Sequence, residues 1–323
     1  MLEPSFLKTF NQTLIDRRLV KPDQKILLAI SGGQDSMCLL YFMLQLQFQW
    51  RWKLGIVFCD HGWYTNSFKA GSFLCRISVL LHLDFFQVSS NLFVRDEISA
   101  RKWRYFVLQK IAKQNNYSVI MTAHTATDRV ETLLINLFRG SGSHGLTALS
   151  WKTFFYSNVF IVRPFLGITR HELTNIHREL NFFLYLDPTN DFLSIQRNKI
   201  RKNFIFYIKK FFNPQIEKNL AQFAEIVSSE SEFLDSLSCC LTRKATFSKY
   251  WINKNYISSL PLALQRRVLQ QILQKGLGFS SCFKHVEHLR LACIKNQFNK
   301  RFVLPHGQIL FLKTHIIFIG VAR

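Results

Sequence analysis

Residues 25–36, KILLAISGGQDS, join a short apolar run to two adjacent glycines. An apolar run of this length, bounded by a turn signal, predicts a buried strand over Lys25–Ile30. Adjacent glycines let the backbone turn tightly, and the N–H groups of the turn then meet the positive end of the helix that follows. Such turns bind anions, so we expect a phosphate at residues 31–36. The alternative is a plain strand-to-helix turn in which Ser31 serves as the cap.

Three more apolar runs follow in the first half of the chain: LGIVFC (54–59), FFQVSS (85–90) and SVIMTA (118–123). Each is followed by a stretch of helical periodicity, which predicts right-handed crossover units. The fold class is therefore α/β, with a parallel sheet that carries helices on both faces. Ligands of such sheets bind beyond the carboxyl ends of the strands. We expect the chemistry in SGGQDS (31–36), DHGW (60–63) and HTATD (124–128).

The composition is that of a folded, strongly basic protein. The 323 residues are 48% hydrophobic and 19% charged, and 42 Lys and Arg against 20 Asp and Glu leave a formal charge of +22. Such a field attracts polyanions, so nucleic acid is the expected partner; a well-solvated basic surface or a preference for anionic membranes is the alternative. No apolar run approaches the roughly 18 residues of a membrane span, and the first residues lack a secretory signal. We expect a soluble protein with no membrane partner.

The seven cysteines include no C-x-x-C pair. Neither a zinc ribbon nor an iron–sulfur site is therefore indicated. Reduced thiols in a reducing compartment fit this pattern best.

The sequence changes character near residue 195. Residues 195–213, IQRNKIRKNFIFYIKKFFN, contain six basic side chains, no acidic one and five aromatic rings. A polar helical stretch at 215–241 leads to a helix at 261–277 and a hairpin at 302–320. At about 100 to 200 residues per domain, the length suggests two domains. We place a nucleotide-binding domain at 1–215, and a helical linker with a small α+β domain at 216–323.

The glycine turn lacks the lysine of the G-x-x-x-x-G-K-S/T loop, which disfavours the usual phosphate-transferring NTPase. S-G-G-x-D-S after the first strand instead resembles the signature of the PP-loop ATP pyrophosphatases. ARKWRY (100–105) resembles their A-R-x-x-R-Y segment, and TAHTATDRVETLLINLFRGSGSHGL (122–146) resembles the block T-A-H-x-x-D-D-x-x-E-T…R-G-S-G-x-x-G-L. DPTN (187–190) with RNKIR (197–201) resembles D-x-x-N…R-N-x-x-R. Together these stretches are similar to the tRNA(Ile)-lysidine synthetase family, strongly over residues 20–215 and weakly beyond.

Two positions depart from the family pattern. Thr127 stands where many members have the first of two aspartates, which puts a metal or lysine role at that position in doubt. Gly62-Trp63-Tyr64 follows Asp60-His61 where a Leu-Arg pair is usual. The Thr-Asp form resembles the cyanobacterial and plastid branch, which implies the plastid stroma, with a bacterial cytoplasm as the fallback. The chain ends near where short members of the family end.

The resemblance implies a ligase that makes lysidine in two steps. ATP adenylates O2 of the wobble cytidine in the CAU anticodon of tRNA(Ile) and releases pyrophosphate. The ε-amine of free lysine then displaces AMP, which switches decoding from AUG to AUA. The implied cofactors are ATP and Mg²⁺, and the implied partners are tRNA(Ile) and L-lysine; a homodimer is left open.

The ATP-binding residues that the resemblance implies follow the first two strands: Ser31, Gly32, Gly33, Gln34, Asp35, Ser36, Asp60 and His61. Gly32, Gly33 and Ser36 would cradle phosphates. Asp35 would hold Mg²⁺, which takes oxygen ligands, or orient the reacting groups. Asp60 and His61 would contact adenine or ribose, although a plain turn fits them almost as well.

The implied catalytic residues are Asp35, Arg104, His124, Asp128 and Glu131. Asp128 and Glu131 are three apart on an expected helix and share a face, where paired carboxylates would bind cationic lysine and accept the proton that its amine loses. An acidic pair that only caps the helix is the alternative. His124 would contact nucleotide or transfer a proton, unless it is a structural histidine. Arg104 would bind a phosphate or the transition state, whereas its neighbour Arg101 could be a surface charge.

The tRNA contacts are expected at Arg139, Arg197, Asn198 and Arg201, together with the C-terminal domain. Arg139 begins a glycine-rich bend whose alternative reading is a helix C-cap at Gly140. The five aromatic rings at 204–212 could stack on unpaired bases, but we expect a helix face that packs in a core.

Two other functions remain open. A tRNA 2-thiolation enzyme would also adenylate a base, but such enzymes usually need catalytic or cluster-binding cysteines. A degenerate PP-loop domain could bind RNA through its charge alone, but the intact S-G-G-x-D-S, Asp128 and Glu131 argue against decay.

Overall fold

The computed structural model describes residues 4–62, 67–90, 97–156, 158–180, 196–248, 251–277, 282–295, 301–304, 307–311 and 315–320. Contacts divide the chain into two compact units, residues 1–228 and 229–323. Each unit has its own sheet and its own core. Residue 215, the boundary expected from the sequence, directly precedes the long helix α10 (Ile216–Ala245).

Six strands form the sheet of the first unit, in the order β3-β2-β1-β4-β6-β5. Their bounds are β1 (Lys25–Ala29), β2 (Lys53–Asp60), β3 (Asp84–Ser89), β4 (Val119–Thr122), β5 (Lys152–Tyr156) and β6 (Val159–Val162). Neighbours pair in parallel from β3 to β6, and β5 runs antiparallel to β6 at one edge. The four expected strands are confirmed as β1 to β4, whereas β5 and β6 were not expected from the sequence.

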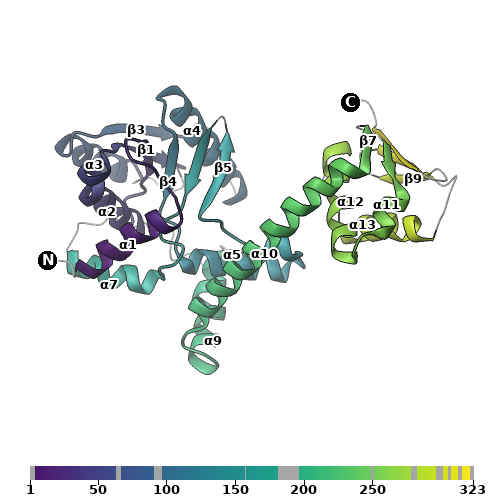
Figure 1. The fold of residues 1–323 in the computed structure, drawn as a ribbon. Helices are drawn as coiled ribbons and strands as arrows, with labels where there is room; N and C mark the ends of the chain where they lie inside the picture. Colours follow the sequence, from purple (N-terminus) through teal and green to yellow (C-terminus); the bar gives the residue numbers. More distant parts are fainter. Residues whose placement is uncertain are drawn as a thin grey trace. The chain divides into compact units, whose positions relative to one another are not determined.

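Helices cover both faces of this sheet (Figure 1). They are α1 (Pro4–Asp16), α2 (Gln34–Trp50), α3 (Ser67–Leu80), α4 (Glu97–Gln114) and α7 (Arg170–Leu180). Helices α5 (Ala126–Phe138) and α6 (Ser143–Leu146) come between β4 and β5 in the chain, and α5 packs in a separate cluster with α10. Successive residues of a strand point to opposite faces. Ile26 and Leu28 therefore join the core with α1, α2, α3 and α7, whereas Leu27 joins the core under α4. The expected parallel sheet with helices on both faces is confirmed.

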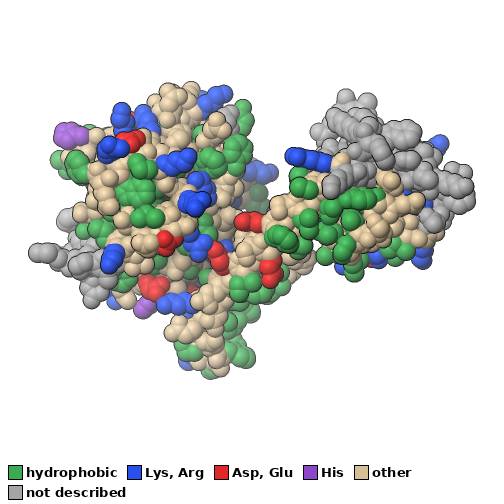
Figure 2. Space-filling view, viewed as in Figure 1, with side chains coloured by type: hydrophobic (Ala, Val, Ile, Leu, Met, Phe, Trp, Pro, Cys, Tyr) green, Lys and Arg blue, Asp and Glu red, His purple; other side chains and the backbone are tan. Residues whose placement is uncertain are grey.

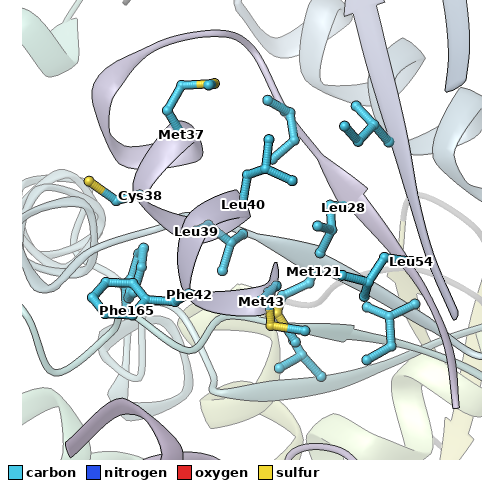
Figure 3. Close-up of a cluster of buried hydrophobic side chains, with 14 of the residues drawn as sticks. Leu28, Met37, Cys38, Leu39, Leu40, Phe42, Met43, Leu54, Met121 and Phe165 are labelled. Atoms are coloured by element: carbon cyan, nitrogen blue, oxygen red, sulfur yellow. The ribbon is translucent and has the colours of Figure 1, made fainter. Parts of the chain in front are cut away.

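The larger core fixes the place where α2 begins. Met37, Leu40 and Met43 recur at helical spacing and are buried near Leu28 (Figure 3). Residues three or four apart share one face of a helix, so this face of α2 packs on the sheet. Burial of this face holds the turn at residues 31–36 at the carboxyl end of β1.

Three short helical segments follow residue 195: α8 (Gln196–Lys199), the π-helical turn η2 (Ile200–Ile205) and α9 (Phe206–Phe211). Ile205 and Ile200 pack with α5 and α10. The aromatic rings that we expected in a core are exposed instead: Phe204, Phe206, Tyr207, Phe211 and Phe212. That expectation was wrong because the isoleucines, rather than the rings, form the buried face of this segment.

The second unit packs helices on an antiparallel sheet of the order β7-β8-β11-β10-β9. Its elements after α10 are β7 (Thr246–Ser248), β8 (Trp251–Asn253), α11 (Lys254–Ser259), α12 (Leu262–Leu277), α13 (Phe283–Ile294), β9 (Arg301–Leu304), β10 (Gly307–Phe311) and β11 (His315–Gly320). Ile309 and Ile316 of the sheet join one core with Val268 and Leu289 of the helices. The helix expected at 261–277 is confirmed. Where a hairpin was expected at 302–320 the structure has three strands, and β10 pairs antiparallel with both β9 and β11.

On the face shown in Figure 2, the basic side chains of the first unit are dispersed. Figure 2 shows Lys and Arg side chains scattered over the visible face of the first unit, with hydrophobic side chains between them. All seven cysteines are free thiols, as expected. Within the described ranges, no helix combines the length and the apolar character that a membrane crossing requires.

Glu225 on α10 ties several elements of the first unit together. Its Oε2 accepts hydrogen bonds from Arg129 Nη1 (2.6 Å) and Trp151 Nε1 (2.8 Å), and its Oε1 accepts one from Arg17 Nη1 (2.6 Å). Arg129 is 2% exposed, and its Nε and Nη2 have no hydrogen-bond partner in the described part of the chain. Because a buried guanidinium needs a counter-charge, Glu225 anchors α10 to α5.

Replacing Glu225 by Gln should lower the free energy of unfolding at pH 7 by about 2 kcal/mol, as measured by urea denaturation. The figure lies below the 3–5 kcal/mol of a fully buried pair because Glu225 is 35% exposed and water screens it. Glu230→Gln, an exposed change on the same helix, should leave stability unchanged. Equal stability of Glu225→Gln and wild type would contradict the anchoring role.

The stabilisation by Glu225 should depend on pH in a defined direction. Burial raises the pKa of Glu225, but hydrogen bonds from Arg129, Trp151 and Arg17 outweigh burial and hold the pKa below its ordinary 4.5. The contribution is therefore fully present above about pH 4.5 and is lost as the pH falls through the lowered pKa of the folded state. The stability difference between wild type and Glu225→Gln should shrink in that acidic range.

Candidate active site

Residues 31–36 form the turn between β1 and α2. Gly32 has a φ of +85°, a left-handed conformation that glycine adopts without strain. Ser36 Oγ donates to the Gly33 carbonyl (2.8 Å), and the Ser31 N–H donates to Ser36 Oγ (3.3 Å). The N–H groups in the first turn of a helix have no partner within that helix, so this turn can donate to an anion.

Asp35 lies at the start of α2 and is held by Arg170, a residue that was not expected in the site from the sequence. Arg170 Nε (2.9 Å) and Nη2 (2.6 Å) both donate to Asp35 Oδ2. Burial raises the pKa of Asp35; Arg170 opposes the rise, and the charge of Asp128 adds to it. Arg170 begins α7, where Glu172 Oε2 accepts from the Thr169 N–H (2.8 Å) and Thr169 Oγ1 accepts from the Glu172 N–H (3.3 Å). The Thr-x-x-Glu pattern is the signal that could have found this helix start.

Thr127 joins α5 to α7. It is 3% exposed, and its Oγ1 accepts a hydrogen bond from the backbone N–H of Arg170 (3.1 Å). The position that carries aspartate in many members of the resembling family therefore supplies a hydroxyl acceptor here. Because Arg170 holds Asp35, Thr127 helps to position that carboxylate.

Asp128 both caps α5 and offers an oxygen to the site. Its Oδ2 accepts from the Thr125 N–H (2.8 Å) and Oγ1 (2.9 Å), whereas its Oδ1 lies 3.5 Å from Arg201 Nη2. Burial raises the pKa of Asp128, but His124, Arg170, the Thr125 N–H and Arg201 lower it on balance. Asp128 therefore caps the helix through Oδ2, as in the alternative named from the sequence. Its Oδ1 is directed to Arg201 and still carries negative charge into the site.

Glu131 is fully buried and pairs with Arg201. Arg201 Nε donates to Glu131 Oε1, and Arg201 Nη2 donates to Oε2 (3.0 Å). Burial raises the pKa of Glu131, and Arg201 opposes the rise. Arg201 lies in η2, and π-helical turns are frequent at functional sites. The structure thus brings Arg201 to the two carboxylates expected to bind lysine, and its tRNA contact stays a prediction.

Three carboxylates meet two guanidiniums in this region, which we call the acidic half of the site: Asp35, Asp128, Glu131, Arg170 and Arg201. One negative charge is left over, and a buried charge without a partner is unfavourable. The acidic half is therefore suited to one additional cation. Among the described residues, no group of three or more His, Cys, Asp or Glu side chains is arranged to hold a metal ion.

A second cluster, the basic half, consists of Arg101, Arg104, Tyr105 and Arg163. Arg163 directly follows β6 and is 5% exposed, while the other three lie on α4. Arg163 Nη2 and Arg101 Nη2 lie 3.5 and 3.4 Å from the Tyr105 hydroxyl. Burial raises the pKa of Tyr105, but the charges of the three arginines lower it on balance. The apolar run at 159–162 was the sequence signal that could have placed Arg163 at the carboxyl end of a strand.

His124 follows β4 and is influenced by both halves. Its Nδ1 shares a hydrogen bond with Thr122 Oγ1 (2.8 Å). Burial lowers the pKa of His124; Asp128 opposes this shift, and the charges of the three arginines of the basic half reinforce it. The imidazole is therefore neutral at physiological pH.

The other residues expected to bind ATP have local partners. Asp60 Oδ1 accepts from the Gly62 N–H (2.9 Å), which is the turn geometry named as the alternative. The His61 ring lies edge-on to Trp103, with 5.0 Å between centroids. Gln34 Nε2 donates to Thr174 Oγ1 (2.9 Å). Contacts of these residues with ATP stay predictions.

The residues expected to bind tRNA lie on or against α5. Exposed Arg139 ends α5, and Gly140 follows with a φ of +72°, as in the C-cap alternative. Arg197 Nη2 lies 3.4 Å from Thr132 Oγ1, and Asn198 is 7% exposed. Their contacts with tRNA stay predictions. The motifs at 187–190 and 63–64 lie outside the described residues.

Comparison with known proteins gives one family. A PP-loop domain model matches residues 2–207. The chloroplastic tRNA(Ile)-lysidine synthase of Zygnema circumcarinatum is 35% identical over 95% of this chain and 85% of its own. The tRNA(Ile)-lysidine synthase of Synechocystis sp. is 40% identical over 82% of this chain and 82% of its own.

A solved structure shares the fold at low sequence identity. The U34-tRNA thiolase NcsA from Methanococcus maripaludis matches with a TM-score of 0.59 and 14% identity, over 70% of this chain and 81% of that chain. At this identity the likeness extends to the fold alone.

His124 should remain neutral between about pH 5 and 8, the range in which an ordinary histidine changes its charge. Its lowered pKa means that the neutral form persists as the pH falls through about 6.5. Histidine NMR signals of the wild-type protein, with His124→Gln to assign the signal, provide the measurement. A midpoint near 6.5 for His124 would contradict the electrostatic description of the site.

Proposed function

The chain belongs to the tRNA(Ile)-lysidine synthase family of PP-loop proteins, and from that premise we propose how its residues carry out the reaction. The activity is ATP-dependent ligation of lysine to the wobble cytidine of tRNA(Ile). In the first step, O2 of the cytidine bonds to the α-phosphorus of ATP and pyrophosphate leaves. In the second step, the ε-amine of lysine bonds to C2, the bond from C2 to the AMP oxygen breaks, and the amine gives up a proton.

The uncompensated negative charge of the acidic half carries the lysine assignment. A lysine side chain brings one positive charge, which matches the one carboxylate charge that Arg170 and Arg201 leave over. Asp128 Oδ1 is the oxygen best placed for it, since Oδ2 already accepts two hydrogen bonds from Thr125. Glu131 offers less, because both of its oxygens accept from Arg201.

The turn at residues 31–36 binds the phosphates of ATP. Its N–H groups and the positive end of α2 face the leaving pyrophosphate, on which negative charge develops. Asp35 fits a Mg²⁺ ion through Oδ1, because the hydrogen bonds from Arg170 fall on Oδ2. Phosphate oxygens and water would complete the coordination, and the ion would neutralise charge on the phosphates.

The proton that leaves the lysine amine passes to a carboxylate of the acidic half. We assign this proton to Asp128 Oδ1, because both oxygens of Glu131 already accept hydrogen bonds from Arg201. His124 has a lowered pKa and is a weak base, so we assign it a hydrogen bond to the bound nucleotide.

The relatives narrow the cellular compartment to a plastid or a bacterial cytoplasm. Similar proteins are named both from chloroplasts, as in Nephroselmis olivacea, and from cyanobacteria, as in Nostoc sp.. We propose the plastid stroma, on the Thr127-Asp128 form of the motif, with a bacterial cytoplasm as the alternative. We also assign tRNA binding to the C-terminal unit.

The test of the activity is transfer of radiolabelled lysine to tRNA(Ile) with a CAU anticodon, in the presence of ATP and Mg²⁺. Elongator tRNA(Met), which has the same anticodon, serves as the control and should remain unlabelled. Asp35→Asn should lose labelling by at least about 100-fold while it still binds tRNA, because the change removes charge at the phosphate site. If AMP and pyrophosphate were released without lysine transfer, the adenylation step would be supported, but lysine would not be the nucleophile.

Asp128→Asn tests the lysine site separately. The amide oxygen can still cap α5, but the negative charge is lost, so the KM for lysine should rise about 10-fold or more while tRNA affinity is unchanged. Glu179→Gln, an exposed change on α7, should behave as wild type. If Asp128→Asn instead weakens tRNA binding and leaves the KM for lysine unchanged, the assignment is wrong.

A further inference from the structure

We propose that the basic half is a second phosphate-binding site, apart from the turn at residues 31–36, in which Arg101 and Arg163 hold one phosphate group of a substrate. The proposal depends on the proposed function only for the source of that phosphate, either ATP or the tRNA backbone. Its physical basis is a set of converging, partly buried cations to which the described protein supplies no anion.

The geometry places two guanidiniums around a single neutral oxygen. Arg101 Nη2 and Arg163 Nη2 reach the Tyr105 hydroxyl at 3.4 and 3.5 Å, the outer limit of hydrogen bonding. The Arg101 guanidinium carbon also lies 5.2 Å from the centre of the Tyr105 ring. A phenol supplies at most a partial negative charge, so these contacts do not neutralise either arginine.

No carboxylate lies within ion-pair distance of Arg101, Arg104 or Arg163 in the described part of the chain. Burial lowers the pKa of Arg101; Tyr105 opposes the shift, and the charges of Arg197, Arg104 and Arg163 add to it. The arginines of the acidic half differ in this respect, because Arg170 and Arg201 each pair with a carboxylate. An anion from a ligand would remove this repulsion.

Arg163 is anchored in a way that leaves one edge for a ligand. Its Nη1 donates to the Ser150 carbonyl (2.8 Å) and to Thr153 Oγ1 (3.0 Å). These two bonds fix a side chain that is 5% exposed, and they direct Nη2 toward Tyr105 and Arg101. The buried Nε has no hydrogen-bond partner among the described residues. A fixed guanidinium edge is suited to a phosphate, which accepts several hydrogen bonds at once.

The sheet brings this cluster next to the reaction site. β6 pairs in parallel with β4, with Val162 opposite Met121, so Arg163 and His124 both follow the carboxyl ends of adjacent strands. The effect of all three arginines on the pKa of His124 reflects the same proximity. A phosphate at Arg163 would therefore belong to a substrate in the reaction site, such as ATP or the nucleotide chain around the target cytidine.

The test compares Arg101→Gln with Lys102→Gln, an exposed change of the same charge on the same helix. One arm measures binding of a non-hydrolysable ATP analogue without tRNA. The other measures binding of tRNA(Ile) without nucleotide at several salt concentrations. Arg101→Gln should weaken one of the two ligands about 10-fold or more, whereas Lys102→Gln should bind both as wild type does.

The two arms identify the source of the phosphate. Loss confined to the ATP analogue assigns the site to a phosphate of the nucleotide. Loss confined to tRNA, with the slope of log affinity against log salt reduced by about 0.7, assigns it to a phosphate of the unpaired RNA loop. Arg101→Lys, which keeps the charge but not the two-pronged donor, should show a smaller loss of the same ligand and covers the case in which Arg101→Gln does not fold.

Three results would overturn the proposal. Arg101→Gln could bind both ligands as Lys102→Gln does, which would make the cluster a structural contact with Tyr105. Both variants could weaken tRNA equally, which would indicate a diffuse field. Arg101→Gln could raise only the KM for lysine, which would indicate that Arg101 binds the carboxylate of the lysine substrate rather than a phosphate. None of these results affects the lysine-transfer assay of the wild-type protein, so the proposed function can fail or stand independently.

Discussion

Compensation of buried charge at the carboxyl edge of the sheet is the constraint on which the site depends. Asp35, Asp128 and Glu131 come from two helices, and Arg170 and Arg201 come from two other segments. Without the guanidiniums, three carboxylates would repel one another in a poorly solvated space. The ion pairs therefore determine how α2, α5, α7 and η2 can meet.

Local structure places each charge with little freedom. The buried face of α2 sets Asp35 at the end of β1, and the capping box at Thr125 directs one oxygen of Asp128 to the backbone and the other to the site. The Thr127 hydroxyl then links the start of α5 to the start of α7. The side chains that would bind substrates are thus supported by helix termini, where unpaired backbone groups need partners in any case.

The opposite charges of the two halves match the charges of the substrates. Lysine brings a cation, whereas ATP and tRNA bring phosphates. The acidic half carries one excess negative charge, and the basic half carries arginines without a carboxylate partner in the described structure. The pKa of His124 responds to both halves: Asp128 opposes the lowering that burial causes, and the three arginines of the basic half reinforce it.

The four central strands, the glycine turn, the helix that carries Asp128 and Glu131, and the family could all be predicted from the sequence. These features follow from short-range patterns: apolar runs of strand length, adjacent glycines, and polar residues at helix starts. The pairing of Arg170 with Asp35 across 135 residues, and of Arg201 with Glu131 across 70, could be seen only in the folded structure. The folded structure also shows that the aromatic rings near residue 206 face solvent while Arg163 is buried. Periodicity specifies which face of an element is apolar, but the partner of a charged side chain depends on how distant elements pack.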